Sequence, residues 1–321
     1  MATSAAVVAS ACLVSALRPA SFVGSRSMRR FASKVVEEAD LPPGAVTVFG
    51  YGSNMSPEGM ASKGLTPLRS RRAILDDWKL SFNMRYAGLC DPAMANVEPC
   101  AGGAVHGVAT TFTPDDLAKL DEEEICYERV TVPVRAYAAD GGEAFEADVY
   151  QFTQAVLEAR PFLKEILSVE EHPPGRRYLN LLTGGARKEN LDEDYLAALE
   201  ASPVATLPAL AEHLTDAALA RIGARRYTMD EVAASAGGDE PLCVLKGVVF
   251  TCDPVRKALW GGRDLTMSEC LRVRVIDSLD EMGDDHKEWI NAMVAERLYF
   301  AAQPEPRIKV MGQIDFDAYG W

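Results

Sequence analysis

Strand-forming residues dominate the first half of the chain, and this pattern limits the possible folds more than any other feature. Five segments combine β-branched and aromatic residues with apolar alternation, and glycine-rich breaks separate them. They are Val46–Tyr51, Ala73–Met84, Ala104–Phe112, Val130–Ala138 and Phe145–Phe152. Because strands outnumber helices up to about residue 185, we expect an α+β first domain built on a twisted sheet or a small barrel.

Helices are predicted at fewer places. Thr113 followed by Pro114 is typical of a helix cap and first turn, and predicts a short helix that ends at Glu123. Leu191–Glu200 has a helical pattern, and the Ala/Leu-rich residues 201–226 are expected to form a helical connector.

A second unit is predicted to begin at Tyr227. Its expected elements are a helix at Met229–Ala234, a strand at Leu242–Phe250, a helix at Asp285–Ala295 and a strand at Ile308–Ile314. A length of 321 residues agrees with two domains. We therefore divide the chain into a leader (1–35), a first domain (45–200), the connector (201–226) and a second domain (227–321).

Charge is unevenly distributed. The chain has 33 basic and 47 acidic residues, yet none of the acidic ones precedes Glu37. Residues 1–35 hold five of the basic ones, so the rest of the chain has 28 against 47, a net charge of −19. An acid-free leader rich in Ala, Ser and Arg predicts an organellar transit segment, for a mitochondrion or a plastid. The alternative is a disordered tail, which would leave the protein cytoplasmic.

The same composition disfavours several classes of function. The acidic balance argues against nucleic-acid binding, which requires clustered cations. The chain has no uninterrupted run of about eighteen apolar residues, so the sequence predicts no membrane span. The four histidines are far apart, with none in an i, i+4 pair, so the sequence predicts neither a metal site nor a cofactor.

The loop after the first predicted strand is a candidate binding site. Glycines on both sides of Tyr51 free the backbone, and Ser53 and Asn54 add polar side chains. Successive amide groups in such a loop can hold a carboxylate, a phosphate or an oxyanion. An ordinary turn between strand and helix is the alternative, and the spacing does not match a nucleotide P-loop.

A run of four acids, Asp121–Glu124, is the second candidate. Such a run is usually a solvated helix end, because mutual repulsion opposes burial of all four. Glu124 is the member most expected to enter the core, since Ile125 and Cys126 follow it. A carboxylate in an apolar cleft can work as a general acid and base near neutral pH.

Both candidates belong to a longer pattern that resembles the γ-glutamylcyclotransferase family. It runs in order through Tyr51–Met55, Trp78–Phe82, Val105–Val108, Leu120–Glu124, Tyr150 and Tyr178–Leu191, and covers about residues 46–200. The resemblance implies a small mixed β-barrel that converts a γ-glutamyl compound into 5-oxoproline and a free amine. It places the catalytic acid at Glu124 and substrate binding at Tyr51, Gly52, Ser53, Asn54, Met55, Tyr150 and Tyr178. A shorter segment between Glu124 and Tyr127 sets this sequence apart from the human-type enzymes.

The implied reaction needs few protein groups. The α-amine of the substrate attacks its own γ-carbonyl group and closes a five-membered ring, so proximity supplies much of the rate. One carboxylate can remove the proton from that amine and pass it to the leaving amine. We therefore expect a small-molecule γ-glutamyl substrate and no cofactor; γ-glutamyl amino acids are favoured, with glutathione and γ-glutamylamines as alternatives.

Residues 227–314 resemble cytochrome b5-like domains of the membrane-associated progesterone-receptor type. The resemblance rests on Tyr227–Ala233, Val244–Phe250, Gly262–Thr266 and Lys309–Ile314. It implies a small α+β domain, but the usual haem-ligand motif is missing, Trp260 lies near the position of the receptor-type ligand tyrosine, and His286 is the one histidine of this unit. An interaction or stabilising module is therefore favoured. A haem or small-ligand binding protein with an inactive first domain is the alternative.

Overall fold

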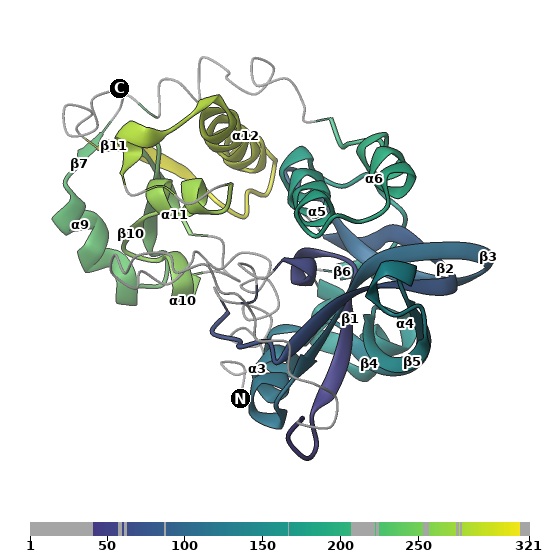
Figure 1. Cartoon of the computed structure of the whole chain (residues 1–321). Coiled ribbons are helices and arrows are strands. Elements are labelled where there is room, and N and C mark those ends of the chain that lie inside the picture. Colours follow the sequence, from purple (N-terminus) through teal and green to yellow (C-terminus); the bar gives the residue numbers. More distant parts are fainter. Residues whose placement is uncertain are drawn as a thin grey trace.

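The computed structural model describes residues 41–314, except for 57–59, 61–62, 87, 166, 207–221, 223–224, 253–256, 274–275 and 277. Two units are visible, the first containing β1–β6 and the second β7–β11 (Figure 1). The predicted leader and most of the predicted helical connector lie outside the described residues. No helix among the described residues is long and apolar enough to cross a membrane.

The first unit is a closed, mixed β-barrel, as the sequence predicts. Its strands are β1 (Val46–Gly50), β2 (Arg69–Tyr86), β3 (Ala93–Phe112), β4 (Glu128–Ala136) and β5 (Ala144–Gln151). The order is β3-β1-β5-β4-β2, and pairing of β2 with β3 closes the ring. β1 and β5 are parallel, whereas the other neighbours are antiparallel. The short β6 (Leu167–Val169) continues the sheet beyond β2.

Apolar side chains from these strands fill the barrel. Phe49, Leu75, Val97 and Val105 are almost completely buried and belong to one core cluster with residues of α4 and α5. Because successive residues of a strand face opposite sides, the alternation in β4 buries Val132 and Val134 and exposes Thr131 and Pro133.

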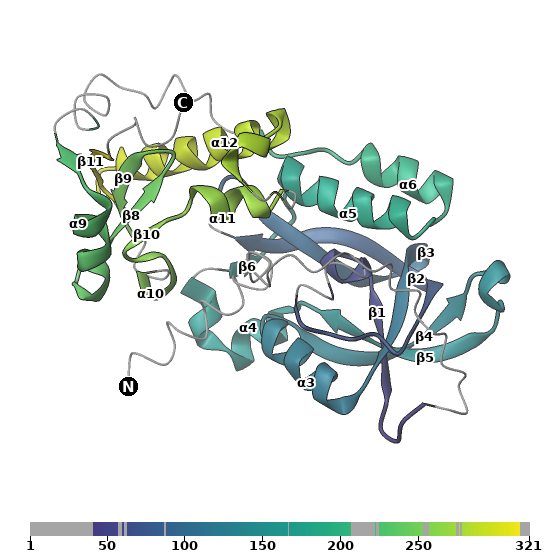
Figure 2. The same ribbon diagram turned by 60° about the vertical axis from the view of Figure 1, so that its left-hand side comes forward.

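Helices surround the barrel. They are η2 (Ser53–Met55), α3 (Pro114–Glu123), η3 (Ala138–Asp140), α4 (Gln154–Ala159), η4 (Pro161–Glu165), α5 (Arg176–Lys188) and α6 (Glu193–Glu200). The predicted helix after Thr113 is confirmed, because the Thr113 side chain accepts a hydrogen bond from the Asp116 amide. Figure 2 shows α5 and α6 side by side above the barrel.

The second unit is an open sheet covered by helices. Its strands are β7 (Arg226–Tyr227), β8 (Leu242–Leu245), β9 (Val248–Thr251), β10 (Arg263–Asp264) and β11 (Val310–Ile314), in the order β10-β8-β9-β11-β7. Its helices are α9 (Met229–Ala234), η5 (Ser235–Gly237), α10 (Lys257–Trp260), α11 (Thr266–Leu271), η6 (Leu279–Glu281) and α12 (Asp284–Ala301). The architecture is α+β; its assignment as cytochrome b5-like stays a prediction.

One strand prediction in this unit was wrong. Leu242–Phe250 is not a single strand but a hairpin, in which β8 and β9 pair antiparallel. Lys246 and Gly247 form its turn with positive φ angles of 48° and 73°. Two central residues with positive φ are typical of the tight turn that joins twisted strands, and glycine adopts such angles at little cost.

Candidate active site

The polar loop begins directly where β1 ends. A side chain at Gly50 would place its Cβ atom 2.7 Å from the carbonyl oxygen of Asn54, so only glycine lets the chain fold back here. The next residues form η2, whose last residue, Met55, is 2% exposed and lies beside Gly185 of α5. The loop is therefore held between the barrel and α5.

Glu124 reaches this loop from the end of α3. It caps that helix, where its amide donates to the Leu120 carbonyl, and only 8% of the residue is exposed. The Asn54 side-chain amide donates to Glu124 Oε1 at 3.0 Å. The two candidates chosen from the sequence, the loop and the acid run, thus meet in space although 70 residues separate them.

Lys63 is a further member of the site, and sequence reasoning missed it. Its ammonium group donates to Asn54 Oδ1 at 2.7 Å and lies 3.4 Å from Glu124 Oε1 and 3.2 Å from Glu123 Oε2. Only 7% of the Lys63 side chain is exposed. The buried acids therefore have a buried cation beside them. No local motif marks Lys63, because Glu124, the carboxylate that it approaches, lies 61 residues away along the chain.

Four tyrosines lie within electrostatic reach of Glu124. Burial, with the negative charge of Glu124 adding to it, raises the pKa of Tyr51, Tyr127, Tyr150 and Tyr178. All four therefore stay neutral at physiological pH and can donate hydrogen bonds without adding charge to the site.

These tyrosines are not equivalent. Tyr51 donates to the Tyr150 carbonyl at 2.5 Å, and Tyr127 donates to the Ala95 carbonyl at 3.1 Å. The Tyr178 hydroxyl accepts from the Ala95 amide at 3.2 Å, which leaves its own hydrogen for another acceptor. The Tyr150 hydroxyl instead donates to Asp121 at 2.6 Å.

The predicted site residues divide into two groups. Glu124, Asn54, Tyr51 and Tyr178 lie together, and Gly52 lies beside the Tyr178 hydroxyl, where an added Cβ would be 3.5 Å away. Ser53 is half-buried in the same loop. Met55 and Tyr150 contribute packing, Met55 against α5 and Tyr150 in a separate apolar cluster with Val48 and Leu120.

Chemically, the site combines the buried Glu124 carboxylate with the Lys63 ammonium group and neutral donors. The described residues contain no group of three or more His, Cys, Asp or Glu side chains that could hold a metal ion. A carboxylate surrounded by oriented donors can transfer protons and bind a polar substrate.

Comparison with known proteins identifies the family of the first unit. Residues 48–168 match the family model described as "Gamma-glutamyl cyclotransferase, AIG2-like". A gamma-glutamyl cyclotransferase of Claviceps purpurea (strain 20.1), gliK, is 27% identical over 153 residues, which cover 44% of this chain and 62% of that relative. The first unit therefore carries a domain of the gamma-glutamyl cyclotransferase, AIG2-like family.

Solved structures are also similar to the chain. A structure titled gamma-glutamyl cyclotransferase has a TM-score of 0.40 at 22% identity, over 50% of this chain and 89% of its own. A human protein described as uncharacterized has a TM-score of 0.41 at 22% identity, over 51% of this chain and 91% of its own.

Proposed function

We propose that the first domain is a γ-glutamylcyclotransferase that releases 5-oxoproline and a free amine from γ-glutamyl amino acids or peptides. The observation that carries the proposal is the buried Glu124 carboxylate, 3.0 Å from the Asn54 amide of the glycine-rich loop, inside the matched family region. Asn54 and Lys63 hold this carboxylate in one orientation, which a proton-transfer group requires.

The first step is ring closure. Glu124 accepts a proton from the α-ammonium group of the substrate, and the freed amine attacks the γ-carbonyl carbon of the same molecule. A carbon–nitrogen bond forms and the carbonyl oxygen gains negative charge. Backbone amides of residues 51–54 and the Tyr178 hydroxyl are the donors available to the substrate carboxylate and to this oxygen.

The second step breaks the original amide bond. Protonated Glu124 gives its proton to the departing nitrogen, the ring nitrogen loses its second proton to the released amine, and the carbonyl re-forms in 5-oxoproline. Nothing is oxidised or reduced, and no water is consumed. The carboxylate returns to its starting state, so one residue suffices for both proton transfers.

Product formation tests the proposal directly. The full chain is incubated separately with γ-glutamyl-alanine, glutathione and γ-glutamyl-lysine, and 5-oxoproline is measured. We expect product, with γ-glutamyl-alanine the best donor. If none of the three yields 5-oxoproline, the proposed function is wrong.

A matched pair of variants tests the role of Glu124. Glu124→Gln preserves size and the contact with Asn54 but cannot accept a proton, so we expect kcat to fall at least about a hundredfold. Glu122→Gln makes the same chemical change at an exposed residue and should leave kcat within about twofold. A fully active Glu124→Gln enzyme would contradict the assignment.

For the second unit we propose a stabilising role without haem. His286 is 0% exposed, and its Nδ1 atom accepts a hydrogen bond from the Gly283 amide at 3.2 Å, at the start of α12. This histidine therefore acts as a helix cap, and its ring is not open to an iron atom. Absence of a Soret band after incubation with haemin is the expected result; a Soret band that His286→Gln abolishes would contradict it.

A further inference from the structure

A cleft open to solvent lies where the two units meet. Tyr86 and Gly88 line it from the first unit, and Trp260, Glu296, Arg297, Phe300 and Arg307 are among the residues that line it from the second. Its empty volume is about 480 Å³, counting the space open to solvent. The lining thus combines three aromatic rings with two arginines and one acid, Glu296.

Arg297 has an unusual environment for a buried cation. It is 5% exposed, and its Nη1 atom makes one long hydrogen bond, 3.3 Å, to the Met293 carbonyl. The guanidinium lies over the Trp260 ring, 4.9 Å from the centroid. Its Nη2 atom is buried without a hydrogen-bond partner, and no carboxylate among the described residues forms an ion pair with it.

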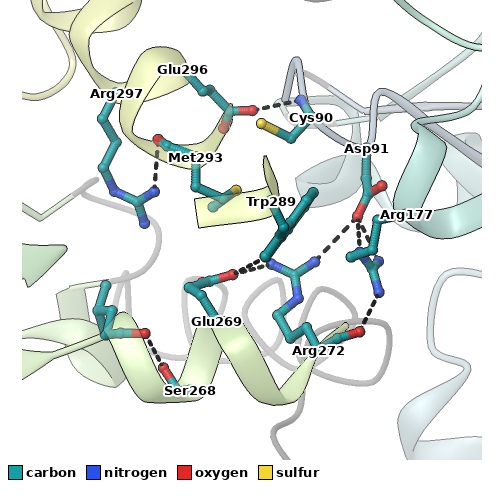
Figure 3. Close-up of polar contacts among 11 residues, drawn as sticks. Cys90, Asp91, Arg177, Ser268, Glu269, Arg272, Trp289, Met293, Glu296 and Arg297 are labelled. Carbon is teal, nitrogen blue, oxygen red and sulfur yellow. Dashed lines mark hydrogen bonds and ion pairs between the residues drawn. The ribbon is translucent and has the colours of Figure 1, made fainter. Parts of the chain in front are cut away.

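Two other buried arginines at the same junction, Arg177 and Arg272, have carboxylate partners and so serve as a comparison for Arg297. Arg177 lies 2.5 Å from Asp91 Oδ2, and Arg272 lies 2.8 Å from Glu269 Oε2 and 3.3 Å from Asp91 Oδ2. Both also lie over the Trp289 ring, at 5.1 and 4.9 Å. Figure 3 shows the two guanidinium groups converging on Asp91, whereas Arg297 points away from it. Arg297 is likewise buried and lies over a tryptophan, Trp260, but no carboxylate among the described residues pairs with it.

Glu296, the acidic residue next to Arg297 in the sequence, is not its ion-pair partner. Glu296 Oε2 accepts from the backbone amides of Leu89 and Cys90, at 2.8 and 2.7 Å. Its carboxylate therefore joins the first unit to α12, and Figure 3 shows it directed toward Cys90 on the side away from the Arg297 guanidinium.

We propose that this cleft is a binding site for a small oxyanion, and that Arg297 is the principal residue that binds it. Guanidinium groups bind carboxylates and phosphates through paired hydrogen bonds, and such charge-assisted bonds are strong where water is excluded. Tyr86, Trp260 and Phe300 offer flat apolar contacts, so the fitting ligand is a compact carboxylate or phosphate that carries an apolar group. The inference does not depend on cyclotransferase activity.

Thermal unfolding of the full chain at constant ionic strength tests the site. One arm is titrated with inorganic phosphate and the other with benzoate, which separates tetrahedral from planar anions. We expect Tm to rise and saturate in at least one arm. Absence of a saturable rise in both arms would overturn the proposal.

Variants connect the binding to Arg297. Arg297→Met should abolish the saturable rise, whereas Arg263→Met, which removes an exposed arginine of the same unit, should leave it unchanged. An equal response of the two variants would overturn the proposal. If Arg297→Met does not fold, Arg297→Lys keeps the charge but not the paired donors, and we expect its Kd to be about tenfold higher or more; an unchanged Kd would overturn the proposal.

Discussion

Two groups of buried charged side chains at the junction of the two units differ in their ion-pair partners. Around Asp91, two acids and two arginines form a neutral group, with both arginines stacked on one tryptophan. Around Arg297, 5% exposed, a single cation lies over Trp260, and no acid among the described residues forms an ion pair with it. The first arrangement pairs its charges within the described residues and holds the units together, whereas in the second no described acid pairs with the cation.

The Asp91 group also bears on the candidate active site. Arg177 immediately precedes Tyr178 at the start of α5, and the N-cap Gly175 lies so close that an added Cβ would be 1.9 Å from the Cys90 carbonyl oxygen. The Tyr178 hydroxyl is in turn joined to Ala95, four residues beyond Asp91. The second unit therefore helps to hold the tyrosine that faces the site.

The largest effect is expected from Asp91→Asn. This change keeps the shape of the side chain but removes the carboxylate that pairs with both Arg177 and Arg272. Loss of one member of a buried charge group should lower the free energy of unfolding by about 3–5 kcal/mol, measured by urea denaturation. A loss below about 1 kcal/mol would mean that the group does not hold the units together.

Lys63→Met should have the next largest effect. Glu123 and Glu124 would lose their buried cation, and we expect a loss of about 3 kcal/mol in the free energy of unfolding. Because Lys63 also orients Asn54, kcat for 5-oxoproline release should fall as well. Stability and activity equal to those of the unchanged protein would remove Lys63 from the site.

Arg297→Met should act in the opposite direction. Without an anion in the cleft, Arg297 is a buried charge with poor compensation, and methionine keeps most of its apolar stem. We expect the free energy of unfolding to stay unchanged or to rise by about 1 kcal/mol. A loss as large as that of Asp91→Asn would show that Arg297 has protein partners comparable to those of Arg177.

The smallest effect is expected from Asp76→Asn, the exposed control for Asp91→Asn. Asp76 pairs with Arg135 at 2.9 Å, but about half of each side chain is exposed, 49% and 46%. Solvent screens such pairs, so the change should cost at most about 1 kcal/mol in the same urea experiment. A cost near that of Asp91→Asn would show that burial does not explain the difference.

Much of the first domain could be predicted because its signals are local. The Thr113–Pro114 cap predicted α3 correctly, since cap and first turn are neighbours in the chain. The alternating segments predicted all five barrel strands, although β2 and β3 extend well beyond the predicted limits. The hairpin of β8 and β9 was missed, because Leu242–Phe250 is apolar throughout apart from the Lys246–Gly247 turn.

The sequence alone determined the strand-rich barrel, the acidic character of the chain and the two segments that contain Asn54 and Glu124. Each of these depends on residue type or on neighbours within a few positions. Only the tertiary structure decided that Lys63 joins those segments, that Asp91 binds two arginines from distant segments, and that no acid among the described residues pairs with Arg297. These are contacts between residues far apart in the chain, and the free energy of burying a charge depends on which groups folding brings next to it.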